Sequence, residues 1–88
     1  MRSHDHDPNK SAANKIKHGI DFDEAQEMWS DERLVLAPAS TDDEPRFLAI
    51  ATIRGKHWSA VCGLRDDQTR ILSVRLSRPE EIEFYEST

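Results

Sequence analysis

Cysteine, glycine and long apolar runs are all scarce in this sequence, and each scarcity excludes a class of protein. Cys62 is the one thiol among 88 residues, so no disulfide can form within the chain. The three glycines are isolated from one another, which excludes a glycine-rich phosphate loop. No apolar run approaches the ~20 residues of a membrane span, and the N-terminal residues lack the apolar stretch of a secretory signal. We therefore expect a protein of the reducing cytoplasm.

Charge, by contrast, is abundant and unevenly distributed. The net charge is −5, yet residues 21–45 hold nine acids against one arginine, and residues 46–78 hold seven cations against two acids. Such segregation predicts one acidic and one basic surface, and a polyanion could bind the basic one. An acidic chain without a recognition-helix pattern fits poorly with a stand-alone DNA-binding protein. A domain this small buries little surface, so a protein partner is also expected.

The first predicted helix covers residues 8–18. Asp7 can cap this helix, and Pro8 suits its first position. Gly19 is expected to end it, because glycine adopts the left-handed conformation without strain. Positive charge in the last turn complements the helix dipole, and that turn holds Lys15, Lys17 and His18. This basic cluster therefore has a structural explanation, whatever its function.

A second helix is predicted from the cap Asp21, which forms a capping-box pattern with Glu24, to about residues 30–31. Its expected core face consists of Phe22, Ala25, Met28 and Trp29. The hydrophobic period then changes to two, which predicts strands at residues 33–37, 46–53, 57–64 and 70–76. A last helix is predicted for residues 79–85 with Arg78 as its cap, because a residue before proline avoids the helical region.

This order of elements predicts an α+β fold: two N-terminal helices, an antiparallel sheet of three or four strands and a C-terminal helix, with the helices on one side of the sheet. Residues 1–6 are expected to be a flexible N-terminus, and residues 7–86 to form a single domain. Strict alternation in the last strand places Leu72, Val74 and Leu76 on one face and Ile71, Ser73 and Arg75 on the other.

No metal or cofactor motif stands out, and no cofactor is expected. The His-Asp-His-Asp stretch at residues 4–7 could bind a metal weakly, but a mobile terminus is the simpler interpretation. Cys62 lies among apolar residues of a strand and is interpreted as a small buried hydrophobe.

The arginines are the strongest candidates for a functional role, namely phosphate binding. Arg75 lies on the less apolar face of its strand, where a rigidly held guanidinium can grip a phosphate with two hydrogen bonds. The alternative for each arginine is an ion pair with one of the abundant acids. For Arg75 the sequence leaves both interpretations open, whereas for Arg54, Arg70 and Lys56, at predicted turns, the ion pair is favoured.

Three blocks of the sequence resemble, in order, the BrnT toxin family. The first block matches through Asp7, Lys10, Asn14, Lys17, His18, Gly19, Ile20, Phe22, Glu24 and Ala25. The second matches through Glu44, Arg46 and Phe47, and the third through Ser73, Arg75, Glu81 and Tyr85. The resemblance implies a fold similar to RelE-type ribonuclease toxins and a type II toxin that cleaves RNA without a metal. It also implies neutralisation by a small antitoxin, BrnA, and binding of promoter DNA only through the toxin–antitoxin complex. A homodimer within such a hetero-oligomer is compatible with it.

Metal-free RNA cleavage uses the 2′-hydroxyl of the substrate as nucleophile, so the protein must move protons and stabilise charge on the phosphorus. The catalytic candidates are His18 for proton transfer, Lys17, and Arg46 and Arg75 for charge stabilisation. The candidates for RNA binding are Lys10, Lys15, Arg65 and Arg78. Trp58 or Tyr85 could stack a base, although each is more often a core residue.

The sequence departs from the family pattern at three positions. His6 stands where the family has tryptophan, Ala51 where it has glycine, and Leu76 where it has the second of two adjacent arginines. The last departure leaves a second hypothesis open: a non-catalytic, toxin-like module that pairs with an antitoxin or another protein. Its acidic band, from Asp21 to Glu44, would suit a basic partner segment.

Overall fold

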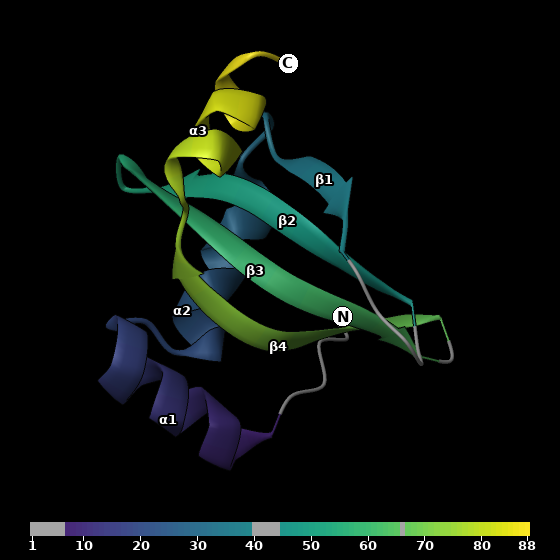
Figure 1. Ribbon diagram of the computed structural model, residues 1–88. Coiled ribbons are helices and arrows are strands. Elements are labelled where there is room, and N and C mark those ends of the chain that lie inside the picture. Colours follow the sequence, from purple (N-terminus) through teal and green to yellow (C-terminus); the bar gives the residue numbers. More distant parts are fainter. Residues whose placement is uncertain (1–6, 40–44, 66) are drawn as a thin grey trace.

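The computed structural model describes residues 7–39, 45–65 and 67–88, and shows an α+β fold (Figure 1). The described elements are helix α1 (Pro8–His18), helix α2 (Phe22–Ala25), the 3₁₀ segment η1 (Gln26–Ser30), strands β1 (Val35–Pro38), β2 (Arg46–Ile53), β3 (Lys56–Arg65) and β4 (Gln68–Leu76), and helix α3 (Pro79–Glu86). No helix in the described ranges is long and apolar enough to cross a membrane.

The four strands form one antiparallel sheet in the order β1-β2-β3-β4, so β1 and β4 are its edges. A tight turn at Arg54 and Gly55, both with positive φ, joins β2 to β3. The pairing of β3 with β4 shifts between Val61, opposite Ser73, and Cys62, opposite Ile71, so Leu72 is an extra residue. This irregularity breaks the alternation along β4.

The bulge overturns the predicted faces of the last strand. Ile71 and Val74 both belong to the hydrophobic core, although strict alternation placed them on opposite faces. Leu76 is 53% exposed, since it lies at the end of the sheet, and it is not a core residue. Arg75 does lie on the face away from the core, as expected.

The core lies between one face of the sheet and the segment 20–28. It is formed by Ile20, Phe22, Ala25 and Met28 together with Ala49, Ala51, Ile53, Trp58, Ala60, Cys62, Ile71 and Val74. Three of the four residues predicted for the core face of the second helix are buried, and Trp29 packs against them half-buried. That helix is shorter than predicted, because its last five residues are 3₁₀.

Helix α3 packs on the opposite face of the sheet. Its Glu81 accepts a hydrogen bond from Ser59 at 2.8 Å, and Ser59 lies between the core residues Trp58 and Ala60, so its side chain points away from the core. The prediction that all helices lie on one side of the sheet is therefore wrong. On this face, Arg75 and Ser59 donate hydrogen bonds to Glu81 of the acidic helix α3. Helix α3 covers only one end of the face (Figure 1).

Helix α1 lies along the outer edge of β4 and is fixed there by polar contacts (Figure 1). Its buried residues are Ser11 and Asn14. The Asn14 amide donates to the carbonyl oxygens of Ile20, at 2.8 Å, and Val74, at 2.9 Å, while its oxygen accepts from the Val74 N–H at 3.1 Å. The Ser11 hydroxyl accepts from the Phe22 N–H at 2.9 Å.

Local signals predicted most boundaries well. The helix at residues 8–18, its cap Asp7, its end at Gly19, the Asp21–Glu24 capping box, the strand at residues 46–53 and the cap Arg78 are all confirmed. The first strand begins two residues later than predicted, and β3 and β4 are longer than predicted. The predicted flexible residues 1–6 and much of the loop at 37–45 lie outside the described residues.

Candidate nucleic-acid interface

The sheet face opposite α2 carries several basic side chains, and we call it the basic face. Arg46 and Arg70 stand in one row, paired on either side with Gly63. Leu48, Val61 and Ser73 form the next row and are half-buried. Ser59 and Arg75 pair in the row after that, beneath the edge of α3. Helix α3 packs on this face over Ser59 and Arg75.

Arg75 is held on the basic face by Glu81 of α3. Its Nη1 and Nη2 donate to the two carboxylate oxygens at 2.8 and 2.9 Å, and the two side chains are 23% and 11% exposed. The hydrogen bond from Arg75 is the largest cause that lowers the pKa of Glu81, to about 2, and the same pair raises the pKa of Arg75. The ion pair offered as the alternative interpretation of Arg75 is therefore present.

This ion pair does not exhaust the guanidinium. An arginine has five N–H donors, and Arg75 uses two on Glu81 and a further one, at 3.3 Å, on the Leu76 carbonyl. Glu81 also accepts from Ser59 and from the Arg78 N–H, each at 2.8 Å, which fixes the carboxylate in place. Arg75 is thus oriented and still has donors for an anion.

His57 is a candidate that the sequence interpretation missed. Its Nε2 lies 2.9 Å from the Glu86 carboxylate, and its ring contacts Tyr85 edge-on at 5.2 Å between centroids. Both partners belong to α3, so the imidazole lies on the basic face, two residues along β3 from Ser59, the partner of Arg75. Alternation with Ser59 on β3 was the available signal, since it places His57 on the less apolar face.

Lys17 and His18 lie elsewhere, at the C-terminal end of α1. Gly19 ends that helix with a φ of 84°, as expected for the left-handed stop. Lys17 is exposed and His18 half-buried. Because α1 borders the outer edge of β4 while Arg75 points to α3, the structure separates these two candidates from Arg46 and Arg75.

The other basic candidates are also dispersed. Lys10 is exposed on α1, and Lys15, on the same helix, pairs with Glu24 at 2.8 Å and lowers the pKa of that carboxyl. Arg78 is exposed at the start of α3. Arg65 ends β3 opposite Gln68, and its side chain lies outside the described parts of the chain. Of the basic site residues predicted from the sequence, those that the structure describes on or beside the basic face are Arg46, Arg75 and Arg78.

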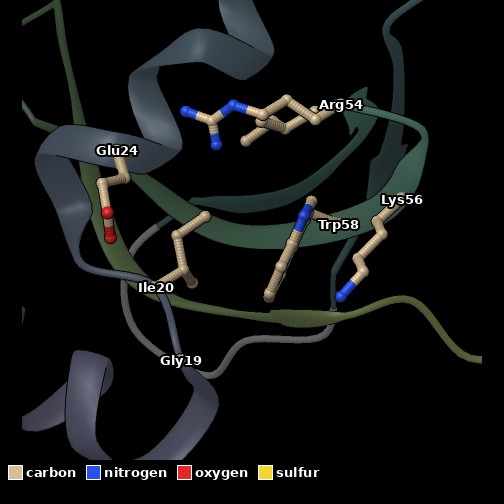
Figure 2. A pocket seen from close by; sticks show the side chains of 7 residues that line it. Gly19, Ile20, Glu24, Arg54, Lys56 and Trp58 are labelled. Carbon is tan, nitrogen blue, oxygen red and sulfur yellow. The ribbon is translucent and has the colours of Figure 1, made fainter.

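A cavity of about 230 Å³ adjoins Gly19 on the other side of the sheet, lined by Gly19, Ile20, Glu24, Ile53, Arg54, Lys56 and Trp58 (Figure 2). Trp58 is 8% exposed and Tyr85 3%, so each is a core residue and neither presents an open ring for stacking. Arg54 pairs with Glu27 at 2.8 Å, as favoured from the sequence. Among the described residues no group of three or more His, Cys, Asp or Glu side chains could hold a metal ion.

Comparison with known families shows which family the chain belongs to. The family described as "Ribonuclease toxin, BrnT, of type II toxin-antitoxin system" matches residues 6–81, which include α1, the whole sheet and the start of α3. The chain belongs to the BrnT family. A search of curated proteins found no match.

Membership of this family has two consequences for the basic face. BrnT proteins are described as ribonuclease toxins, so RNA, a polyanion, is the ligand to test for binding to the basic face. A type II system pairs its toxin with an antitoxin, so a second protein must also find a surface on this small domain. The similarity to RelE-type toxins stays a prediction.

Proposed function

We propose that this chain is a metal-independent endoribonuclease toxin that binds RNA on the basic face and is neutralised by a cognate BrnA-like antitoxin. The observation that supports the proposal best is the arrangement around Arg75. A guanidinium with unused donors lies on the basic face, fixed by Glu81, with the His57 imidazole on the same face. The proposed place of action is the cytoplasm, where the RNA substrate is.

The chemistry requires three functions from the protein. The 2′-oxygen of the substrate attacks the phosphorus and loses its proton, and the 5′-oxygen leaves and gains one. Arg75 would donate to the phosphorane oxygens, where charge develops in the transition state. His57 would exchange protons, because imidazole does so near neutral pH. Ser59 and Ser77, whose hydroxyls lie 2.7 Å apart, are the polar groups between them.

Glu81 is a poor candidate for the base. A carboxylate with a pKa of about 2 has little affinity for the proton of a hydroxyl at neutral pH, and its oxygens already accept four hydrogen bonds. We therefore assign Glu81 the positioning of Arg75. Lys17 and His18, in the other layer, remain rival candidates for catalysis on the α1 side.

Cleavage assays with purified protein test the proposal. RNA should be cut in excess chelator, leaving 2′,3′-cyclic phosphate ends, and an oligonucleotide with 2′-deoxyribose at the cleaved position should resist. Activity that is lost in chelator and restored by Mg²⁺ would contradict the metal-free chemistry. Co-expression with the protein encoded by the adjacent reading frame should give a stable complex that no longer cleaves RNA.

The non-catalytic module remains the second candidate, because Leu76 replaces the second arginine of the family and Arg75 is already ion-paired. In that case the chain would bind the antitoxin with the same stability and leave RNA intact. Expression without the partner separates the two functions: growth arrest with loss of intact RNA supports the enzyme, and normal growth at verified protein levels supports the module.

A further inference from the structure

Arg46 and Arg70 stand in one row of the sheet, at the end of the basic face away from α3. Arg46 pairs with Gly63 of β3, and Gly63 pairs with Arg70 of β4. Neighbouring strands are ~4.8 Å apart, so the two Cα atoms are about 10 Å apart, and the residue between them in the row is a glycine. The next residue of each strand belongs to or packs on the core of the other face, which places the row on the basic face.

Arg70 differs from the other arginines whose contacts are known. Arg54 pairs with Glu27 and Arg75 with Glu81. Arg70 is half-buried, its Nε is buried without a hydrogen-bond partner, and within the described ranges no carboxylate pairs with it. The buried Nε cannot itself reach an external ligand, but the Nη groups of this half-buried guanidinium are suited to an anionic oxygen, because no carboxylate in the described ranges neutralises the charge.

We infer that Arg46 and Arg70 form a binding site for a backbone phosphate of RNA, separate from the phosphate at Arg75; this inference rests on the proposed RNA substrate. Gly63, which separates the two arginines in the row, contributes no side chain of its own to the space between them. A phosphate oxygen entering there can accept from both arginines, and arginine matches phosphate with two parallel hydrogen bonds. Contacts to phosphate carry no sequence information, so the site would position RNA of any sequence.

The distance along β3 between this site and Arg75 means that the bound phosphate is not the one that is cleaved. Gly63 lies four positions after Ser59, the partner of Arg75, which corresponds to about 13 Å along β3. This distance exceeds the length of one nucleotide in an extended RNA chain. The half-buried row of Leu48, Val61 and Ser73 lies between the two sites and offers apolar surface to the bases.

Binding of an RNA that cannot be cleaved tests the site. The probe is a fluorescein-labelled oligonucleotide with 2′-O-methyl groups throughout, which lacks the nucleophile, and its Kd is measured by anisotropy at several salt concentrations. Arg70→Gln and Arg46→Gln should each raise Kd about tenfold and reduce the slope of log K against log salt by about 0.7. Arg54→Gln removes the same charge from the β2–β3 turn and should change neither by as much.

The outcomes are distinct. If both variants bind like Arg54→Gln, the site is wrong, whether or not the wild-type chain cleaves RNA. If both lose affinity while the wild type leaves natural RNA uncut, the phosphate site stands and the ribonuclease proposal fails. Should Arg70→Gln not fold, as judged by circular dichroism, Arg46→Gln decides the matter alone, because Arg46 is exposed at the start of β2.

Discussion

Asn14 pairs with Val74 as a further strand would. Its side-chain amide donates to the Val74 carbonyl at 2.9 Å and accepts from the Val74 N–H at 3.1 Å, which satisfies both backbone groups on the open edge of β4. The same amide nitrogen reaches the Ile20 carbonyl at 2.8 Å. One polar residue therefore fixes α1 to the sheet and to the segment that leads into α2, which explains how a helix without buried apolar residues stays in place.

Replacement of Asn14 by alanine should destabilise the domain on the order of 3 kcal/mol, because three buried hydrogen bonds are lost and three backbone groups are left without a partner. Urea unfolding of the purified chain measures this change. Ile16→Ala, on the same helix but 87% exposed, is the matched control and should stay within about 0.5 kcal/mol of wild type. Equal stability of the two variants would show that α1 is held by other contacts.

Replacement of Arg75 by alanine should lower the cleavage rate by roughly 10²-fold or more, because the charge on the phosphorane loses its donor. The ion pair adds a second effect: Glu81 would be left largely buried without its partner, at a cost on the order of 2 kcal/mol. The rate must therefore be measured per folded molecule. Arg75→Lys should recover only part of the activity, since an ammonium lacks the planar fork.

Glu81→Gln separates the two roles of that ion pair. The amide oxygen can still accept one of the two hydrogen bonds from Arg75, so the guanidinium stays near its place and activity should fall far less than in Arg75→Ala. A Glu81→Gln variant as inactive as Arg75→Ala would mean that the carboxylate itself takes part in proton transfer.

The two histidines provide a direct comparison. His57→Gln should lower the rate at neutral pH and flatten its pH dependence, because His57 lies on the face that carries Arg75. His18→Gln, at the end of α1, should leave both unchanged. The reverse result, with His18 essential and His57 dispensable, would move the catalytic centre to the α1 side and reject the assignment made above.

The elements that the sequence predicted well are those with local signals. Asp7, Gly19 and the Asp21–Glu24 pair act on groups within a few residues, so their roles follow from spacing alone. The side of the sheet taken by α3 depends on Arg75 meeting Glu81, a contact between two elements, and the bulge at Leu72 depends on the register of β4 against β3. Neither the side taken by α3 nor the bulge can be predicted from one segment of the sequence alone.

The candidate site shows the same division. Arg75 was placed on the correct face because alternation holds locally on either side of the bulge. His57 was passed over, since a histidine in a strand acquires meaning only when α3 and Arg75 come to the same face. Lys17 and His18 stood out as a motif, but their position at the end of α1 also follows from the helix dipole and the glycine stop.

Stability should fall steeply in acid. Burial opposes ionisation of Asp31, but hydrogen bonds from Thr52, from the Arg33 N–H and from Tyr85 outweigh it and lower the pKa of Asp31 from 3.8 to about 2; the pKa of Glu81 falls from 4.5 to about 2. A depressed carboxyl pKa stabilises the fold above the unfolded pKa, so this contribution is complete above about pH 4.5 and is lost as the pH falls to 2.

Thermal unfolding between pH 7 and pH 2.5 measures that contribution. Asp31→Asn should lower Tm by about 10 °C at pH 7 and by less at pH 2.5, where the wild type has lost the same interaction. Glu32→Gln, at the exposed neighbouring position, should track wild type throughout. An Asp31→Asn variant with the wild-type pH profile would show that Asp31 is not the group that titrates.

Leu76→Arg introduces the second arginine that the family resemblance predicts at this position, and it tests which side of β4 is used. Leu76 is 53% exposed and pairs with Trp58, a core-face residue, so its side chain lies on the face opposite Arg75. A long cation there can reach solvent, and Tm should stay within about 4 °C of wild type, in contrast to the several kcal/mol expected for a buried position. Because the new guanidinium would lie on the side of α1 and Gly19, away from Arg75, we expect the cleavage rate to remain within about threefold of wild type.

Leu76→Ala is the control for this prediction, since it removes the leucine without adding charge. The contradicting result would be a large gain in cleavage with Leu76→Arg that is absent from Leu76→Ala and is lost again when His18→Gln is added. That result would place the chemistry beside α1 and leave the basic face to bind RNA or the antitoxin.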